Sequence, residues 1–153
     1  MPSAELHNMT LAEAAGLIST RKLSPVEYTD RLLARTEALE PQLNAFITRT
    51  PDVAMTAARA AEAEIMHGNW RGPLHGIPYA LKDIYDTTGI LTSGHSRTCI
   101  DRIPDKDATA VARLKAAGAV LTGKLATHEF AHGGHPQISG RDALERRQQL
   151  VDL

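Results

Sequence analysis

The sequence predicts an α/β fold, in which helices come first and strands then alternate with helices. Apolar residues recur at helical spacing in three segments between residues 10 and 68, and each segment begins at residues that commonly start helices. From residue 76 onward, two runs rich in strand formers are separated by one helical pattern and followed by another. The order strand, helix, strand, helix favours layers of helix and sheet with at least one parallel pair of strands.

The first two helices are predicted from capping motifs. Thr10 and Glu13 have the spacing of a capping box, in which each side chain accepts the backbone N–H of the other residue. Ser24-Pro25-Val26-Glu27 repeats the motif with a proline at the first helical position. The second helix is predicted to run to about Leu39 and to end before Pro41, because proline disfavours the helical conformation in the residue ahead of it.

A third helix is predicted from Thr50-Pro51 to a stop at Gly68. Its apolar face consists mainly of alanines, which suits close packing against a sheet or another helix. Residues 44–48, ahead of it, form either a short strand or an extended connection. Nothing on these N-terminal helices requires a chemical explanation, so we interpret them as scaffold.

The first predicted strand, within residues 76–85, carries the first candidate functional residue. Alternate residues of a strand face opposite ways, so Lys82 shares one face with Pro78, Ala80 and Ile84. An ammonium among apolar neighbours loses part of the hydration that keeps it charged, and such a lysine can act as a base near neutral pH. The alternative is a lysine at a strand end that extends into water or pairs with an acid. Spacing alone leaves both interpretations open.

The remainder of the chain continues the alternation. Residues 91–102 show no clean period and are predicted to form a loop. A helix capped by Asp107 is predicted to reach Gly118, and a short strand follows over residues 119–122. Another helix is predicted over residues 126–131.

Composition is typical of a globular protein from a reducing compartment. The 153 residues fit one domain, and 17 Lys and Arg against 18 Asp and Glu leave no basic excess that would predict contact with nucleic acid or an anionic membrane. The single cysteine, Cys99, excludes an internal disulfide and is interpreted as a small buried apolar residue. The N-terminus does not resemble a secretory signal, and charges interrupt every long apolar run. We therefore expect a cytoplasmic protein without a membrane span.

Three ordered blocks of sequence resemble the amidase signature family. The first is Gly76-Ile77-Pro78-Tyr79-Ala80-Leu81-Lys82-Asp83, the second lies within residues 107–124, and the third is Glu129-Phe130-Ala131. The resemblance covers about residues 11–134, and blocks in this order at ordinary loop spacings are hard to obtain by chance. It implies that the N-terminal helices are followed by part of the mixed sheet of the amidase signature fold, and that this sheet is incomplete.

The resemblance also implies an activity. Members of the family hydrolyse a carboxylic amide to an acid and ammonia, or use glutamine for amide transfer, through a Ser–cis-Ser–Lys triad. Lys82 stands at the position that matches the family's lysine, the base for the bridging serine. The implied partner is a small-molecule amide, and the family needs neither a cofactor nor a metal.

The two serines of the triad have no counterpart in this sequence. In the family they come from a stretch of Gly-Gly-Ser-Ser-Gly type and a position after it, and the chain contains no such stretch. We therefore expect residues 1–134 to be the N-terminal part of a truncated amidase domain, and residues 135–153 to be a non-matching, helical tail. We expect the chain to be inactive alone. An unfinished sheet would expose strand edges through which the chain can self-associate.

Two alternative functions compete with the amidase interpretation. His128-Glu129-Phe130-Ala131-His132 matches HExxH, in which the histidines lie one helical turn apart and bind zinc while the glutamate acts as general base. His135 could supply a third ligand. Against a zinc-dependent hydrolase, Gly133 ends the predicted helix directly after the second histidine. The other alternative is a non-catalytic interaction fragment.

Residues 118–124 match the GxxxxGK pattern of phosphate-binding loops. Leu125 stands where a magnesium-binding serine or threonine is required, and the middle residues are strand formers. A paired strand cannot offer the successive free N–H groups that cradle a phosphate. We therefore predict a strand here and no nucleotide site.

Overall fold

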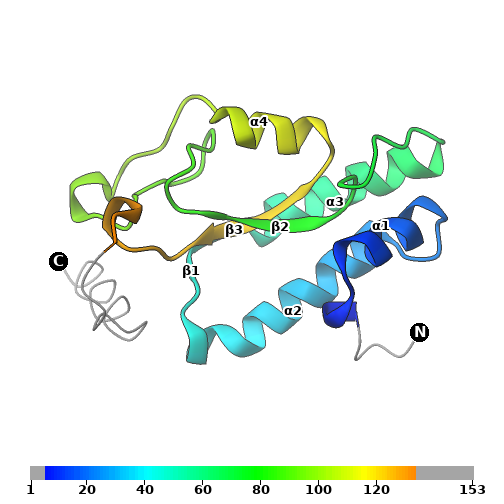
Figure 1. The fold of residues 1–153 in the computed structure, drawn as a ribbon, viewed down its shortest axis with the longest axis horizontal. Coiled ribbons are helices and arrows are strands. Elements are labelled where there is room, and N and C mark those ends of the chain that lie inside the picture. The colour runs from blue at the N-terminus through cyan, green and yellow to red at the C-terminus, as the bar shows by residue number, and fades with distance from the viewer. Residues whose placement is uncertain (1–5, 134–153) are drawn as a thin grey trace. The chain divides into compact units, whose positions relative to one another are not determined.

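The computed structural model of the chain describes residues 6–133 (Figure 1). Its helices and strands are, in order, α1 (Leu11–Ser19), α2 (Pro25–Leu43), β1 (Phe46–Arg49), α3 (Pro51–Met66), β2 (Pro78–Lys82), α4 (Thr109–Ala116) and β3 (Val120–Leu125). No helix in this range is both long and apolar enough to cross a membrane. The predicted boundary at residue 134 and the predicted tail at residues 135–153 lie outside the described residues.

Contacts divide the described residues into two compact units. The first unit comprises residues 6–38, 50–80 and 112–122, and the second comprises residues 39–49, 81–111 and 123–133. Because each unit combines segments that are distant in sequence, each depends on contacts between those segments and not on one continuous stretch of chain.

The three strands form a mixed sheet in the order β1-β3-β2, as the sequence predicted for an α/β fold. β1 pairs with β3 in antiparallel register. β2 runs parallel to β3, since the hydrogen bonds advance along both segments in the same direction: Gly76 N–H donates to Gly118 O and Val120 N–H to Ile77 O, both at 2.9 Å. Parallel strands need a long crossover connection between them, and here that connection contains α4.

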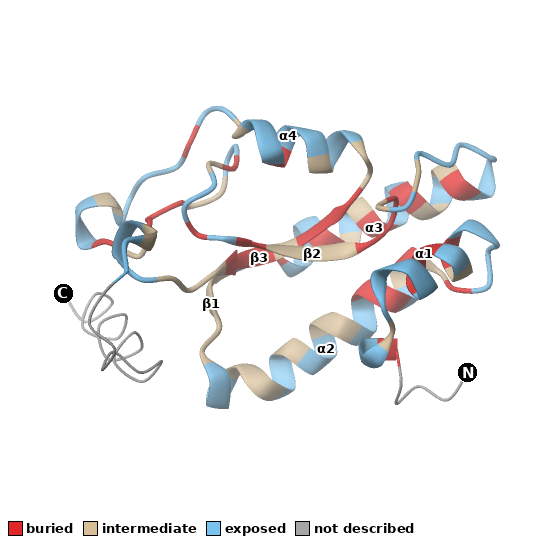
Figure 2. Ribbon diagram, viewed as in Figure 1, coloured by how far each residue is buried: buried red, intermediate tan, exposed pale blue. Residues whose placement is uncertain are grey.

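The apolar core of the first unit joins its three helices to the start of β2. Its buried members come from all three helices and their connections: Leu6, Ala14, Ala15, Ile18, Leu23, Tyr28, Ile65 and Ile77. A second cluster packs α3 against β3 through the fully buried Ala54, Ala58 and Val120. Figure 2 shows the buried positions in β3 and at intervals along α3. The small alanine side chains let helix and strand approach closely, as the sequence predicted.

The helix starts follow the predicted caps. Glu13 N–H donates to Thr10 Oγ1 at 3.2 Å, and Thr10 N–H donates to the Glu13 carboxylate at 2.7 Å, so the capping box is complete. Glu27 N–H donates to Ser24 Oγ at 3.0 Å at the start of α2. The four N–H groups at a helix start lack partners within the helix, and these contacts satisfy some of them.

The end of α2 differs from the prediction. The helix continues through Pro41 to Leu43. Pro41 lies in the last turn, so the helix loses only one backbone donor there. Asn44 adopts a left-handed conformation with φ +48°, and its N–H closes the turn on Glu40 O at 2.8 Å.

The buried side chain of His75 restricts position 118, just before β3, to glycine. His75 is fully buried; its Nδ1 accepts the Arg71 N–H at 3.2 Å, and its Nε2 lies 3.3 Å from the Glu64 carboxylate. Gly118 has φ +78°, and a Cβ at this position would lie 2.3 Å from His75 Cδ2. The connection from α4 to β3 therefore requires glycine for both its backbone angle and its packing.

We expect Gly118→Ala to destabilise the protein more than Gly68→Ala. Both glycines have positive φ, +78° and +86°, so alanine adds about 1 kcal/mol of backbone strain at either position. Only at Gly118 does the new methyl group also meet His75, which adds about 1–3 kcal/mol of overpacking. Urea unfolding of the two variants measures the difference, and equal losses would contradict the packing argument.

We also expect stability to fall in mild acid because of His75. Burial lowers the pKa of His75 from its ordinary 6.5, and this outweighs the opposite effect of Glu64. The unfolded chain then binds the proton more readily than the native protein, so the free energy of unfolding is complete above about pH 6.5 and decreases below it. Denaturant unfolding at about pH 7.5 and about pH 5.5 measures this. The pH dependence should weaken in His75→Gln, and an equal dependence in that variant would refute the assignment.

Candidate functional site

Lys82 is the last residue of β2, and its side chain is exposed. Pro78 and Ala80 on the same side of the strand are half-buried, and Ile84 is 39% exposed. Among residues 6–133 the Lys82 side chain makes no hydrogen bond or ion pair. Of the two interpretations, the exposed lysine at a strand end holds for the described residues, and burial among apolar neighbours is wrong.

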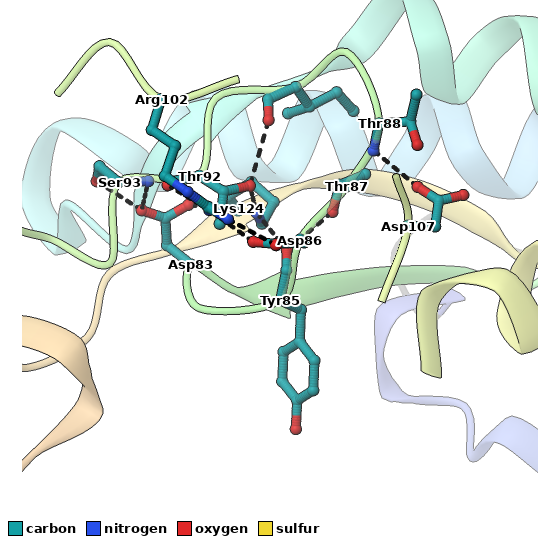
Figure 3. A network of polar contacts seen from close by, with 11 residues as sticks. Asp83, Tyr85, Asp86, Thr87, Thr88, Thr92, Ser93, Arg102, Asp107 and Lys124 are labelled. Carbon is teal, nitrogen blue, oxygen red and sulfur yellow. Dashed lines mark hydrogen bonds and ion pairs between the residues drawn. The ribbon is translucent and has the colours of Figure 1, made fainter. Parts of the chain in front are cut away.

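The next residue, Asp83, forms a buried ion pair with Lys124 of β3 (Figure 3). Lys124 Nζ lies 3.3 Å from Asp83 Oδ1, and both side chains are fully buried. The ammonium also donates to the backbone oxygen of Tyr85 at 2.8 Å and to Thr92 Oγ1 at 2.6 Å. Two hydrogen bonds and one ion pair thus stabilise the ammonium.

Asp83 connects three segments of the second unit. Its Oδ2 accepts both the N–H of Ser93 at 3.0 Å and the hydroxyl of Ser93 at 2.7 Å. Its own N–H donates to Leu125 O at 3.1 Å, which continues the pairing of β2 with β3. Its carbonyl accepts the Gly94 N–H at 2.9 Å. The end of β2, the end of β3 and the segment around Ser93 therefore meet at one carboxylate residue.

Burial and a neighbouring carboxylate act in opposite directions on the pKa of Lys124. Burial lowers the pKa of Lys124 from its ordinary 10.5, and the neighbouring Asp83 carboxylate offsets part of this effect. The ammonium of Lys124 thus has two hydrogen bonds and one ion pair inside the protein. The strand predicted over residues 119–122 is confirmed and extends to Leu125, so the GxxxxGK match lies largely on a paired strand.

A second, exposed ion pair lies beside the buried one. Arg102 donates to both carboxylate oxygens of Asp86, at 2.6 and 2.7 Å, and this lowers the pKa of Asp86. Asp107, predicted to cap α4, accepts the Thr88 N–H at 2.7 Å, beyond the turn at residues 82–85. These contacts lie close to the buried ion pair (Figure 3).

The helix predicted over residues 126–131 is wrong. Residues 129–131 form a single 3-10 turn in which Phe130 and Ala131 have φ +49° and +56°. Phe130 N–H donates to Gly94 O at 2.7 Å, a contact 36 residues distant in sequence that competes with an α-helical bond. Tertiary hydrogen bonding therefore overrides the helical pattern of the sequence.

The zinc motif loses its geometry for the same reason. His128 and His132 flank the 3-10 turn in extended conformations and do not lie one turn apart on an α-helix. The Glu129 carboxylate accepts the hydroxyl of Ser96 at 2.7 Å. Within residues 6–133 no group of three His, Cys, Asp or Glu side chains is placed to hold a metal ion. His135 lies outside the described residues.

Sequence reasoning missed the buried network. It considered Lys124 as the end of a GxxxxGK match and of a block that resembles the amidase family, and it gave neither Lys124 nor Asp83 a role in a network. One signal was available: Lys124 lies in a run of strand formers, where a charge is rarely buried without a partner. The partner itself could not be found from sequence, because Asp83 is 41 residues away.

We expect Lys124→Met to destabilise the protein much more than Arg102→Gln. The first substitution leaves the Asp83 carboxylate buried without its counter-charge, which costs about 3–5 kcal/mol. The second breaks an exposed pair, whose side chains are 44% and 36% accessible, and costs at most about 1 kcal/mol. Urea unfolding measures both. Comparable losses would show that the buried pair contributes no more than the exposed one.

Comparison with known proteins gives a consistent set of relatives. The sequence model of the family described as amidase matches residues 27–140. A glutamyl-tRNA(Gln) amidotransferase subunit of Geobacter metallireducens is 47% identical over 135 residues, which are 88% of this chain and 28% of the relative. The putative amidase AmiD of Mycobacterium tuberculosis is 44% identical over 134 residues, 87% of this chain and 28% of the relative.

The fold of the chain is also similar to that of a solved amidase structure. The native peptide amidase from Stenotrophomonas maltophilia matches with a TM-score of 0.76 at 36% identity, over 84% of this chain and 26% of that one. The chain spans about 28% of the length of the curated relatives it matches.

Proposed function

The chain belongs to the amidase family, and we propose that it supplies the lysine, Lys82, of a site that hydrolyses a carboxylic amide to an acid and ammonia. The observation that carries this proposal is the place of Lys82 within the matched region, at the end of β2, where the chain leaves the sheet. The substrate is a small-molecule amide. Similarity to a component of an amidotransferase favours glutamine-dependent amide transfer as the second candidate reaction.

In the proposed mechanism the Lys82 amine accepts the proton of a bridging serine, which activates the nucleophilic serine. Attack on the amide carbon forms an acyl-enzyme and releases ammonia, and water then releases the acid. An exposed ammonium keeps its hydration, so the described residues do not supply the desolvation that a lysine base requires.

The described serines are engaged elsewhere. Each of the four in residues 6–133 donates its hydroxyl to another group: Ser19 to Gly16 O, Ser24 to Glu62, Ser93 to Asp83 and Ser96 to Glu129. None of them bonds Lys82. We infer that residues 6–133 hold the base position but no nucleophile, and that the chain alone is inactive.

The two alternatives fare differently. A zinc-dependent hydrolase has no support in the described geometry, since the HExxH residues do not form an α-helix.

The second alternative, a non-catalytic interaction fragment, stays a prediction. Self-association would occur at the outer strands β1 and β2 of the described sheet. The cytoplasmic location also stays a prediction.

We expect the chain to release no more ammonia from propionamide than its Lys82→Ala variant releases. Lys106→Ala, which removes another exposed lysine of the second unit, is the matched control. An ammonia assay measures all three proteins. Turnover that Lys82→Ala abolishes and Lys106→Ala retains would show that the chain forms a working site and would contradict its inactivity.

A chimera tests the role of Lys82 directly. Residues 27–140 replace the matching portion of a full-length peptide amidase, and hydrolysis of its amide substrate is measured. We expect Lys82→Ala to lower kcat by at least about 100-fold, the scale of a lost general base, while Lys106→Ala leaves it unchanged. An active chimera that tolerates Lys82→Ala would overturn the proposal.

A further inference from the structure

We propose that Asp83 and Lys124 are positioning residues for Lys82: their buried ion pair holds the turn after β2 and thereby sets the place from which the Lys82 amine acts. The catalytic meaning of this inference rests on the proposed function of Lys82. The positioning itself is a property of the chain and can be measured without turnover.

The turn after β2 is held at both ends. The Lys82 carbonyl accepts the N–H groups of Ile84 at 2.8 Å and Tyr85 at 3.2 Å, which closes the turn on Lys82 itself. At the far end, the Tyr85 carbonyl accepts Lys124 Nζ at 2.8 Å. Asp83 lies between these points and pairs with the same ammonium. A displacement of the turn would therefore move the backbone of Lys82 and would break contacts of Lys124.

The side chain of Tyr85 plays no part in this arrangement. Figure 3 shows its ring directed away from the network, while its backbone faces Lys124. Tyr85 is 39% exposed. Lys124 thus bonds the main-chain oxygen of residue 85. The contact depends on the backbone position of this residue and not on its side chain.

An ion pair supplies something here that an apolar pair of similar volume cannot. Replacing a buried ion pair by well-packed apolar residues is often neutral or stabilising, so net stability does not account for burying two charges. The β2–β3 pairing already has its backbone hydrogen bonds. What would be lost with the charges is the donor to the Tyr85 carbonyl and the acceptor for Ser93. The pair therefore fixes the backbone positions of the residues that follow Lys82.

The experiment compares two double variants of the full chain by NMR. Asp83→Leu with Lys124→Met replaces the buried pair by apolar residues, and Asp86→Asn with Arg102→Gln neutralises the exposed pair as the control. The readouts are hydrogen exchange of the Ile84 and Tyr85 amides and the backbone order parameter of Lys82. The Val120 amide, bonded to Ile77 O at 2.9 Å in the first unit, reports on stability elsewhere.

We expect the buried-pair variant to exchange Ile84 and Tyr85 about tenfold faster, the scale of one lost hydrogen bond, with Val120 changed less than about twofold. The order parameter of Lys82 should fall from about 0.85 toward about 0.6. The exposed-pair control should change neither readout. Unchanged exchange at Ile84 and Tyr85, or an equal acceleration at Val120, would overturn the proposal.

A second variant keeps the test decisive if the first does not fold. Thr92→Val retains both charges and removes one acceptor of the Lys124 ammonium. Faster exchange confined to Ile84 and Tyr85 supports the positioning role, and no change there contradicts it. Neither result depends on amide hydrolysis, so failure of the proposed function, seen as an active chimera that tolerates Lys82→Ala, is distinguishable from failure of the positioning role.

Discussion

The second unit depends on the ion pair between Asp83 and Lys124, which the protein removes completely from water. Two buried charges are tolerated only when each meets its counter-charge and enough hydrogen-bonding groups. Here those groups come from the turn after β2, from the segment at Thr92 and Ser93, and from β3. Because the three segments are distant in sequence, satisfying the charges requires them to assemble together. The free energy needed to bury the two charges therefore restricts the backbone of these three segments to positions in which the charges are satisfied.

Two lysines on neighbouring strands illustrate how position decides chemistry. Lys124 lies on β3, the middle strand, and is fully buried with two hydrogen bonds and an ion pair inside the protein. Lys82 lies at the end of β2, an outer strand, and is exposed without a polar partner among residues 6–133. The buried lysine holds the surrounding segments together through contacts inside the protein. The exposed lysine is available for chemistry, and its neighbour in sequence is one of the residues that fix the backbone.

The comparisons place the chain in the amidase family, over about 28% of the length of the curated relatives. The match to a peptide amidase structure covers 84% of this chain and 26% of that one. The family's sequence model matches residues 27–140, which include the strand that carries Lys82, the crossover through α4 and the partner strand β3. The chemistry proposed for Lys82 needs groups beyond residues 6–133, since their four serine hydroxyls are all engaged in other contacts.

Elements whose causes are local could be predicted from the amino-acid sequence, whereas the partners of the site could not. Capping residues predicted the starts of α1 and α2, small residues predicted the packing face of α3, and three blocks of residues identified the family. The 3-10 turn at residues 129–131 instead forms because Phe130 bonds Gly94. The burial of Lys124 depends on the groups of Asp83, Tyr85 and Thr92 that folding brings around its ammonium. Hydration, counter-charge and strand order are properties of groups brought together by folding, and no spacing along the chain records them.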